Sequence, residues 1–365
     1  MSDGATIALD WEVPHPKYDS SVHVRLGDSQ VKANVLYGPI DLPVVIIMHG
    51  INNDTGFGYM KSLMRSCADK GWIACGMNFR GCGGQKLTTP RGYNAAYTGD
   101  LRGVVEKISA RLKHQDRTPV FLAGFSLGAN IMVKFMGEEG FSRTLPSCIQ
   151  GAISLGNPLH INSANVPFPY NMLLGAGVKK SLLQSWSAVR DMSSCFHFGG
   201  AVRQALLSRT IGELDNVMSP FLIRNENTYP FSASVGYKDG EEYWHDASSN
   251  RYIQHVTVPL LKLSSQDDAL VVDGALRSLS RCLENPNVLV VKTKCGGHLG
   301  WQEASPHGFG FGKSWADAAT TDFIEAVLEM KSKDHRDDGV TAAKKPGSVD
   351  IVESMYASKN LQSKL

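Results

Sequence analysis

Short runs of aliphatic and β-branched residues alternate along the chain with longer amphipathic stretches. Such runs predict buried strands, and apolar positions that recur three and four residues apart predict helices. We expect strands at 22–26, 31–37, 44–48, 72–78, 120–124, 151–155, 259–263 and 288–292, and helices at 59–70, 98–113, 127–137, 274–283 and 314–330. This order predicts an α/β fold, in which a mostly parallel central sheet carries helices on both faces.

The interval 158–250 breaks this alternation. It contains no clear sheet strand, but it is rich in aromatic residues, Pro and Gly and includes at least two amphipathic segments. We therefore expect a cap inserted into a core formed by residues 1–157 and 251–330. A set of apolar positions in the cap fits one helix face, which is expected either to line a pocket or to pack on the core. These positions are Met172, Leu173, Val178, Leu182, Leu183 and Trp186.

After residue 330 the composition turns to Lys, Asp, Ser, Gly and Ala, with few large apolar side chains. Such a segment cannot bury enough apolar surface to offset the entropy of ordering it. We therefore expect residues 331–365 to form a flexible tail.

Composition narrows the functional classes. The formal net charge is +2 and the charges are interspersed, which gives no reason to expect a nucleic-acid partner. Apolar runs such as 43–48 are too short to cross a bilayer, and the acidic start at 1–16 does not resemble a secretion signal. The seven cysteines are an odd number without paired short spacings, so we expect buried reduced thiols rather than disulfides or a zinc site. No ligand cluster is visible in the sequence, and we expect neither a metal nor an organic cofactor.

The segment Gly124-Phe125-Ser126-Leu127-Gly128 lies between a predicted strand and a predicted helix. A serine at the tip of such a sharp turn adopts a strained backbone conformation, and glycines two residues before and after it remove side chains that would collide. Its hydroxyl then stands at the end of the sheet and at the positive end of a helix. An ordinary turn serine is the alternative, but the flanking strand and helix favour Ser126 as a nucleophile.

A serine hydroxyl needs a base to take its proton, and a further group to hold that base in the correct tautomer. His298 follows a late strand in a Gly-rich loop and is the expected base, with His307 as the alternative. The expected acid is Asp268, which follows the strand before it, and the adjacent Asp267 is the alternative. A small residue three positions earlier and an apolar pair shortly afterwards favour Asp268.

Attack on an acyl carbon also requires donors for the oxyanion, usually two backbone N–H groups. The N–H of Leu127, directly after the nucleophile, is one expected donor. The other is expected after the strand at 44–48, where the loop begins His49-Gly50-Ile51-Asn52. By analogy with other His-Gly loops we expect the N–H of Ile51 to be this donor, and His49 to shape the loop.

Several distant segments together resemble one branch of a known superfamily. They are His49-Gly50 with Tyr59; Asn78-Phe79-Arg80-Gly81-Cys82-Gly83-Gly84; Leu87-Thr88-Thr89-Pro90-Arg91 with Tyr93 and Thr98-Gly99-Asp100; Gly124-Phe125-Ser126-Leu127-Gly128-Ala129-Asn130; Thr210-Ile211 with Asp215; Gly236-Tyr237 with Tyr243; Asp267-Asp268; and Gly296-Gly297-His298-Leu299-Gly300. Over residues 41–330 the chain resembles the abhydrolase-domain esterases of the α/β-hydrolase superfamily. This branch includes bacterial YheT-type hydrolases, plant embryogenesis-associated proteins, animal medium-chain phospholipases and fungal medium-chain ethyl-ester synthases.

The resemblance implies an α/β-hydrolase fold, a triad of Ser126, Asp268 and His298, and an acyl-ester substrate. It also implies structural roles for Arg80 and Asp100, with Arg80 in a buried ion pair behind the site. We expect a serine carboxylic-ester hydrolase that acts on medium-chain or lipid-like acyl esters. An acyltransferase or an acyl-CoA thioesterase with the same triad is the alternative, and a non-enzymatic binding protein is disfavoured because the site positions are intact.

Two departures from the relatives leave the subfamily and the preferred chain length open. The acid loop reads Asp267-Asp268-Ala269-Leu270 where relatives usually have Asp-Asp-Pro. The His-Gly loop continues Ile51-Asn52-Asn53-Asp54 where relatives usually have Leu-Thr-Gly-Gly.

The chain ends in Ser363-Lys364-Leu365, a tripeptide that the peroxisomal import receptor reads at a free C-terminus. We therefore expect that receptor as a partner and a location in the peroxisome or a related microbody. A cytoplasmic location is the alternative.

Overall fold

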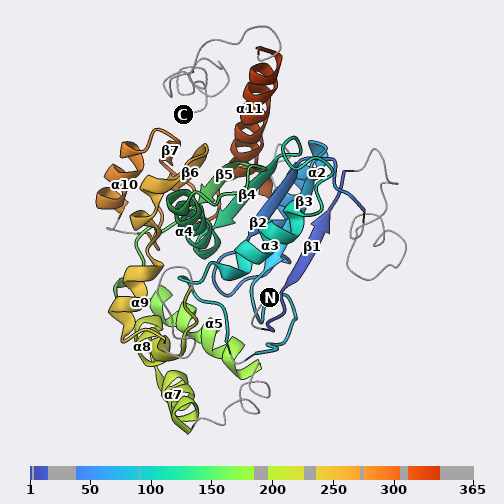
Figure 1. Ribbon diagram of the computed structural model, residues 1–365. Helices are drawn as coiled ribbons and strands as arrows, with labels where there is room; N and C mark the ends of the chain where they lie inside the picture. Colours follow the sequence, from blue (N-terminus) through green and yellow to red (C-terminus); the bar gives the residue numbers. More distant parts are fainter. Residues whose placement is uncertain are drawn as a thin grey trace.

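The computed structural model describes residues 1, 4–14, 38–89, 91–184, 196–225, 236–271, 275–304 and 311–337. They form an α/β fold around a seven-stranded sheet with the order β1-β3-β2-β4-β5-β6-β7 (Figure 1). Strand β1 is antiparallel to β3, and the other neighbouring pairs are parallel. The strands are β1 (Ala8–Glu12), β2 (Val44–Met48), β3 (Ile73–Asn78), β4 (Val120–Phe125), β5 (Ile149–Leu155), β6 (Leu260–Ser265) and β7 (Val288–Thr293).

Six of these strands coincide with predicted apolar runs, but β1 was not predicted. It lies at the edge of the sheet and buries only Trp11 among its five residues, so its sequence carries no continuous apolar run. The predicted strands at 22–26 and 31–37 lie outside the described residues.

The central strands are buried on both faces. In β2 all five side chains are buried, and alternate residues pack against opposite faces, with Ile46 on one side and Ile47 on the other. A parallel sheet with both faces covered produces this continuous apolar sequence. Helices α3 (Gly99–Ser109), α4 (Leu127–Ser142) and α10 (Ala275–Glu284) cover the first face, and α2 (Gly58–Asp69) and α11 (Trp315–Asp337) cover the second.

Helix ends differ from the predicted ones by several residues. Helix α3 ends at Ser109 rather than at 113, and α4 continues beyond 137 to Ser142. Helix α11 reaches Asp337 and therefore includes the first seven residues of the predicted tail. Straight-chain polar residues such as Lys continue a helix readily where they face solvent, and residues 331–333 are exposed.

The described part of the interval 158–250 contains helices and no sheet strand. Figure 1 shows these helices gathered at one end of the sheet. They are η2 (Ser163–Asn165), α5 (Tyr170–Gln184), α7 (Phe196–Leu207), α8 (Ile211–Met218), η3 (Ser219–Phe221) and α9 (Gly240–Ala247). Two short helices, η4 (Ser249–Arg251) and η5 (Ile253–His255), then lead back to β6 against α4.

After β7 the chain forms a small antiparallel pair, β8 (Gln302–Ala304) and β9 (Phe311–Ser314), before α11. Among the described helices, none is both long enough and apolar enough to cross a bilayer. Ser363, Lys364 and Leu365 lie outside the described residues, so peroxisomal import stays a prediction from the sequence.

Candidate active site

Ser126 stands at a sharp turn between β4 and α4. Its backbone has φ 52° and ψ −112°, a positive φ that costs a non-glycine residue conformational energy. A Cβ atom on Gly124 would lie 2.6 Å from the backbone of Ala129, and one on Gly128 would lie 2.6 Å from the carbonyl oxygen of Met48. Both glycines are therefore required by close backbone packing, as a strained strand-to-helix turn demands.

A continuous chain of hydrogen bonds links the three residues predicted to carry the chemistry. Nε2 of His298 lies 2.7 Å from Oγ of Ser126, and Nδ1 of His298 lies 2.8 Å from Oδ2 of Asp268. Because the carboxylate accepts the proton of Nδ1, Nε2 is left to accept the serine proton. The side chain of Asp268 is 2 % exposed and that of His298 is 20 % exposed.

The second oxygen of Asp268 is held by the backbone that follows it. Oδ1 accepts hydrogen bonds from the N–H groups of Leu270 at 2.9 Å and Val271 at 3.1 Å. The carboxylate is therefore fixed on one side by its own loop while its other oxygen faces His298. Leu270 and Val271, the apolar pair of the acid loop, supply these backbone donors and also line the cavity.

The neighbouring Asp267 faces a different partner. Its exposed carboxylate accepts hydrogen bonds from the N–H groups of Gly297 at 2.8 Å and Gly296 at 3.3 Å. These bonds, led by the one from Gly297, lower the pKa of Asp267. The two adjacent aspartates thus hold one loop in different ways, because Asp267 binds the backbone just before His298 and Asp268 binds the imidazole. The other candidate base, His307, lies outside the described residues.

His49 is fully buried and shapes the loop after β2. Its Nδ1–H donates to the carbonyl oxygen of Gly50 at 2.7 Å, and its Nε2 accepts the N–H of Phe79 at 3.2 Å. Burial lowers the pKa of His49 to about 4, so the ring is neutral at physiological pH. Both ring nitrogens are thus hydrogen-bonded to backbone groups, which agrees with the expectation that His49 shapes the loop.

Two tyrosine hydroxyls bind the amides on either side of Ile51. The N–H of Gly50 donates to Tyr59 at 3.0 Å, and the N–H of Asn52 donates to Tyr93 at 3.1 Å. Ile51, between them, lines the same cavity as Ser126 and Leu127. The N–H groups of Gly50 and Asn52 are therefore already hydrogen-bonded within the protein, and Ile51 between them lies at the cavity wall.

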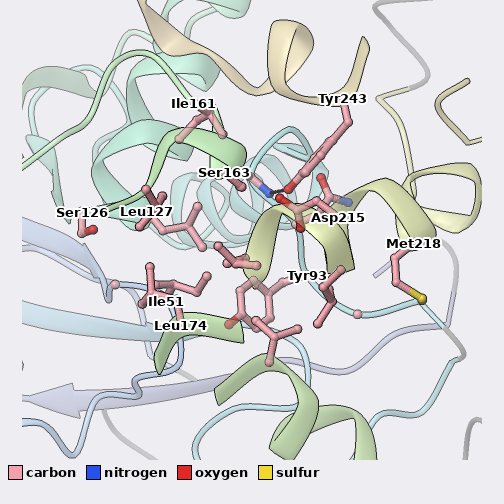
Figure 2. A pocket seen from close by; sticks show the side chains of 18 of the residues that line it. Ile51, Tyr93, Ser126, Leu127, Ile161, Ser163, Leu174, Asp215, Met218 and Tyr243 are labelled. Atoms are coloured by element: carbon pink, nitrogen blue, oxygen red, sulfur yellow. Dashed lines mark hydrogen bonds between the residues drawn. The ribbon is translucent and has the colours of Figure 1, made fainter. Parts of the chain in front are cut away.

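The cavity has a volume of about 820 Å³ and lies between the core and the cap (Figure 2). Ser126, His298 and Leu299 contribute to its wall from the core. Cap residues with apolar side chains form much of the rest, and they include Ile161, Leu174, Val178, Leu182, Ile211, Leu214 and Met218. Such a mixture of apolar walls and few polar groups is typical of small-molecule sites, whose volumes run to about 300–1,000 Å³.

The predicted lining face of α5 is partly wrong. Val178 and Leu182 line the cavity together with Leu174, which was not predicted. Met172, Leu173 and Leu183 are instead exposed at 48 %, 63 % and 56 %, and Trp186 lies outside the described residues. The lining positions are four residues apart and share one face of the helix, whereas the predicted set spreads over two.

Charged residues outside the hydrogen-bonded chain also lie near the cavity, among them the buried Arg80 and Asp100 and the half-buried Asp215. Arg80 forms a bidentate pair with Asp100 at 2.6 and 2.7 Å, and both side chains are at most 6 % exposed, as the resemblance implied. The sequence did not single out Asp215 on α8 by its chemistry, although this carboxyl also lines the cavity. No local pattern marks a lone carboxyl of this kind, and only its place in a matching segment could have drawn attention to it.

In the part of the chain that the structure describes, no group of His, Cys, Asp and Glu could hold a metal ion.

Comparisons with known proteins point to one family. The family model described as serine aminopeptidase, S33 (Hydrolase_4) matches residues 42–298. The embryogenesis-associated protein EMB8 of Picea glauca is 26 % identical over 90 % of this chain and 65 % of its own length. A monoacylglycerol lipase of Saccharomyces cerevisiae is 30 % identical over 71 % of this chain and 55 % of its own length. The phospholipase ABHD3 of Mus musculus is 26 % identical over 90 % of this chain and 70 % of its own length. The chain thus spans less than two thirds of the first two relatives.

Proposed function

The chain belongs to the serine aminopeptidase S33 (Hydrolase_4) family, an α/β-hydrolase family, and from this premise we propose that it is a serine carboxylic-ester hydrolase acting on medium-chain or lipid-like acyl esters. The observation that carries the proposal is the hydrogen-bonded chain from Ser126 through His298 to Asp268 at the wall of a largely apolar cavity. The names of two relatives, a lipase and a phospholipase, support an ester substrate.

The reaction proceeds through an acyl-enzyme. His298 takes the proton of Ser126 as the serine oxygen attacks the ester carbonyl, and it then protonates the departing alcohol. Asp268 keeps the Nδ1–H tautomer of the imidazole and stabilises the imidazolium that forms. Water activated by the same histidine releases the acid and restores the serine.

The N–H groups of Ile51 and Leu127 stabilise the oxyanion that forms in each step. Leu127 is the first residue of α4, so its amide points from the positive end of the helix. Both residues line the cavity beside Ser126. The loss of one such donor typically lowers turnover by about 10²–10³.

The triad is tested by covalent labelling. A fluorophosphonate probe should label the wild-type protein, and the matched variant Ser126→Ala, which removes one hydroxyl, should fold normally and stay unlabelled. An intact wild-type protein that resists the probe would instead support a non-enzymatic role. A panel of p-nitrophenyl esters of graded acyl length should then show the highest kcat/KM for medium chains, because an acyl chain that fills the apolar cavity buries the most apolar surface.

Two alternatives keep the same acyl-enzyme and differ in the reaction partner. An acyltransferase passes the acyl group to an alcohol, and a thioesterase receives it from acyl-CoA. The ratio of free acid to new ester in the presence of added alcohol distinguishes a hydrolase from a transferase. Comparison of an acyl-CoA with the ethyl ester of the same acid distinguishes a thioesterase from an esterase.

A further inference from the structure

Asp215 takes no part in the proposed chemistry, yet it lines the same cavity as Ser126. Figure 2 shows it beside Tyr243, across the cavity from the serine. Its Oδ2 accepts the Nε1–H of Trp244 at 3.0 Å, and the hydroxyl of Ser163 also hydrogen-bonds to it. The residue lies deep in the fold but keeps some accessible surface, and this surface faces the cavity that it lines.

The surroundings of Asp215 stabilise its charge poorly. Burial raises the pKa of Asp215 to about 6, and the groups that act against this effect are two neutral donors, Ser163 and Trp244. A carboxylate offers about four acceptor positions, so two donors do not saturate it. Its remaining acceptor capacity lies at the cavity wall, where the donor of a bound molecule can reach it.

Tyr243 supplies the complementary group. Its hydroxyl oxygen accepts the N–H of Ala95 at 3.0 Å, and among the described residues its own hydrogen has no acceptor. Burial raises the pKa of Tyr243 well above its usual value, so it stays protonated at neutral pH. Asp215 and Tyr243 thus present an acceptor and a donor side by side on the wall of one cavity.

We propose that Asp215 and Tyr243 form a polar subsite that binds a hydroxyl group of the ester substrate. A hydroxyl both donates and accepts, so it can give its hydrogen to Asp215 and receive that of Tyr243. An ammonium group has no acceptor for the tyrosine hydrogen, and its burial among apolar side chains carries a large desolvation cost. The hydroxyl belongs either to the alcohol part of the ester or to its acyl chain, and the inference rests on the proposed ester hydrolysis.

Matched pairs of esters test the subsite. In one pair 1-octanoylglycerol is compared with propyl octanoate, which lacks the free hydroxyls of the alcohol part. In the other, methyl 10-hydroxydecanoate is compared with methyl decanoate, which lacks the hydroxyl of the acyl chain. For at least one pair the wild-type protein should have the higher kcat/KM for the hydroxylated ester, and that pair identifies the source of the hydroxyl.

The variant Asp215→Asn should reduce this preference about tenfold or more, because a hydrogen bond to a charged group becomes one to a neutral group. Tyr243→Phe should also reduce the preference for the hydroxylated ester, and it serves as the test variant if Asp215→Asn fails to fold. The matched control is Trp244→Phe, which removes the indole donor to Asp215 but leaves the carboxylate in the cavity. This control should keep the preference of the wild-type protein.

Several results would overturn the inference. One is a preference for the hydroxylated ester that stays unchanged in Asp215→Asn. Another is an equal loss of this preference in Trp244→Phe, which would indicate a purely structural role for the carboxylate. A third is a wild-type preference for an aminoacyl ester over both hydroxylated esters. Fluorophosphonate labelling separates these results from failure of the proposed function. A protein that is labelled but shows no hydroxyl preference refutes the subsite alone, whereas one that is neither labelled nor active refutes both.

Discussion

The buried imidazole of His49 should make the protein less stable in mild acid. The ring is fully buried, donates through Nδ1 to the carbonyl oxygen of Gly50, and accepts the N–H of Phe79 at Nε2. A second proton would have to enter at Nε2, which faces another N–H group. Desolvation by burial is the largest cause that lowers the pKa of His49, from 6.5 to about 4.

The sign of the effect follows from the difference in pKa between the two states. The unfolded chain takes up a proton near pH 6.5, whereas the folded protein resists it until about pH 4. The contribution of His49 to the free energy of unfolding is therefore complete above pH 6.5 and declines as the pH falls. Each pH unit in this window costs about 1.4 kcal/mol, so the loss is about 1.4 kcal/mol at pH 5.5 and about 3 kcal/mol at pH 4.

Two buried carboxyls act in the opposite direction. Burial raises the pKa of both Asp215 and Asp317 to about 6, so the folded protein binds their protons before the unfolded chain does. Their contributions to stability therefore increase as the pH falls through 6. The pH dependence of the wild-type protein alone mixes these effects, and only a comparison with variants at position 49 isolates the histidine.

The assay is equilibrium unfolding in urea at pH 7.5, 6.5, 5.5 and 5.0. His49→Asn and His49→Gln are both non-titrating, and both should be less stable than the wild-type protein at pH 7.5 because they lose a backbone contact. This gap in unfolding free energy should narrow by about 1.4 kcal/mol between pH 7.5 and 5.5, by the same amount for the two variants. A gap that stays constant with pH would refute the claim that His49 is buried in its neutral form.

Substitution of the two adjacent aspartates should affect kcat for ester hydrolysis very differently. Asp268→Asn should lower it about 10⁴-fold, because an amide does not hold the required tautomer of His298. Asp267→Asn should cost less than about tenfold, since its amide oxygen can still accept from a backbone N–H, and the reverse order would make Asp267 the acid. Gly128→Ala should lower the free energy of unfolding by about 3 kcal/mol, because its Cβ would meet backbone carbonyl oxygens at 2.6 Å; an unchanged urea midpoint would contradict this packing. A fluorescent fusion that ends in Ser363-Lys364-Leu365 should concentrate in peroxisomes, and a diffuse cytosolic signal would count against the import prediction.

The sequence predicts the core well because the relevant signals are local. Strand β2 is apolar at every position since both of its faces are covered, and the turn at Ser126 is marked by two glycines that its backbone packing requires. The positions of Asp268 and His298 after successive strands bring them to one edge of the sheet, because β6 and β7 are parallel neighbours. These features depend on strand order and turn geometry, which leave clear traces in a single sequence.

The cap is less predictable because its partners decide which residues it buries. Leu173 and Leu183 are apolar and helical but exposed, whereas Leu174 faces the cavity. Helical periodicity alone does not determine which face meets the core. Asp215 has no local signal either, since only the fold around it makes one carboxyl lie deep in an apolar cavity.

The attachment of the cap depends on polar residues that the sequence places inside an apolar helix. Asn130 of α4 donates to the carbonyl oxygens of Ala95 and Ala247, at 3.2 and 2.8 Å, and one turn later the buried ammonium of Lys134 lies 2.7 Å from Asp246. In an amphipathic surface helix both residues would face water, but here they bind the end of α9. Helix α4 also begins directly after Ser126. One helix therefore holds Ser126 at its start and the returning segment of the cap along its side, and so joins the two parts of the cavity wall.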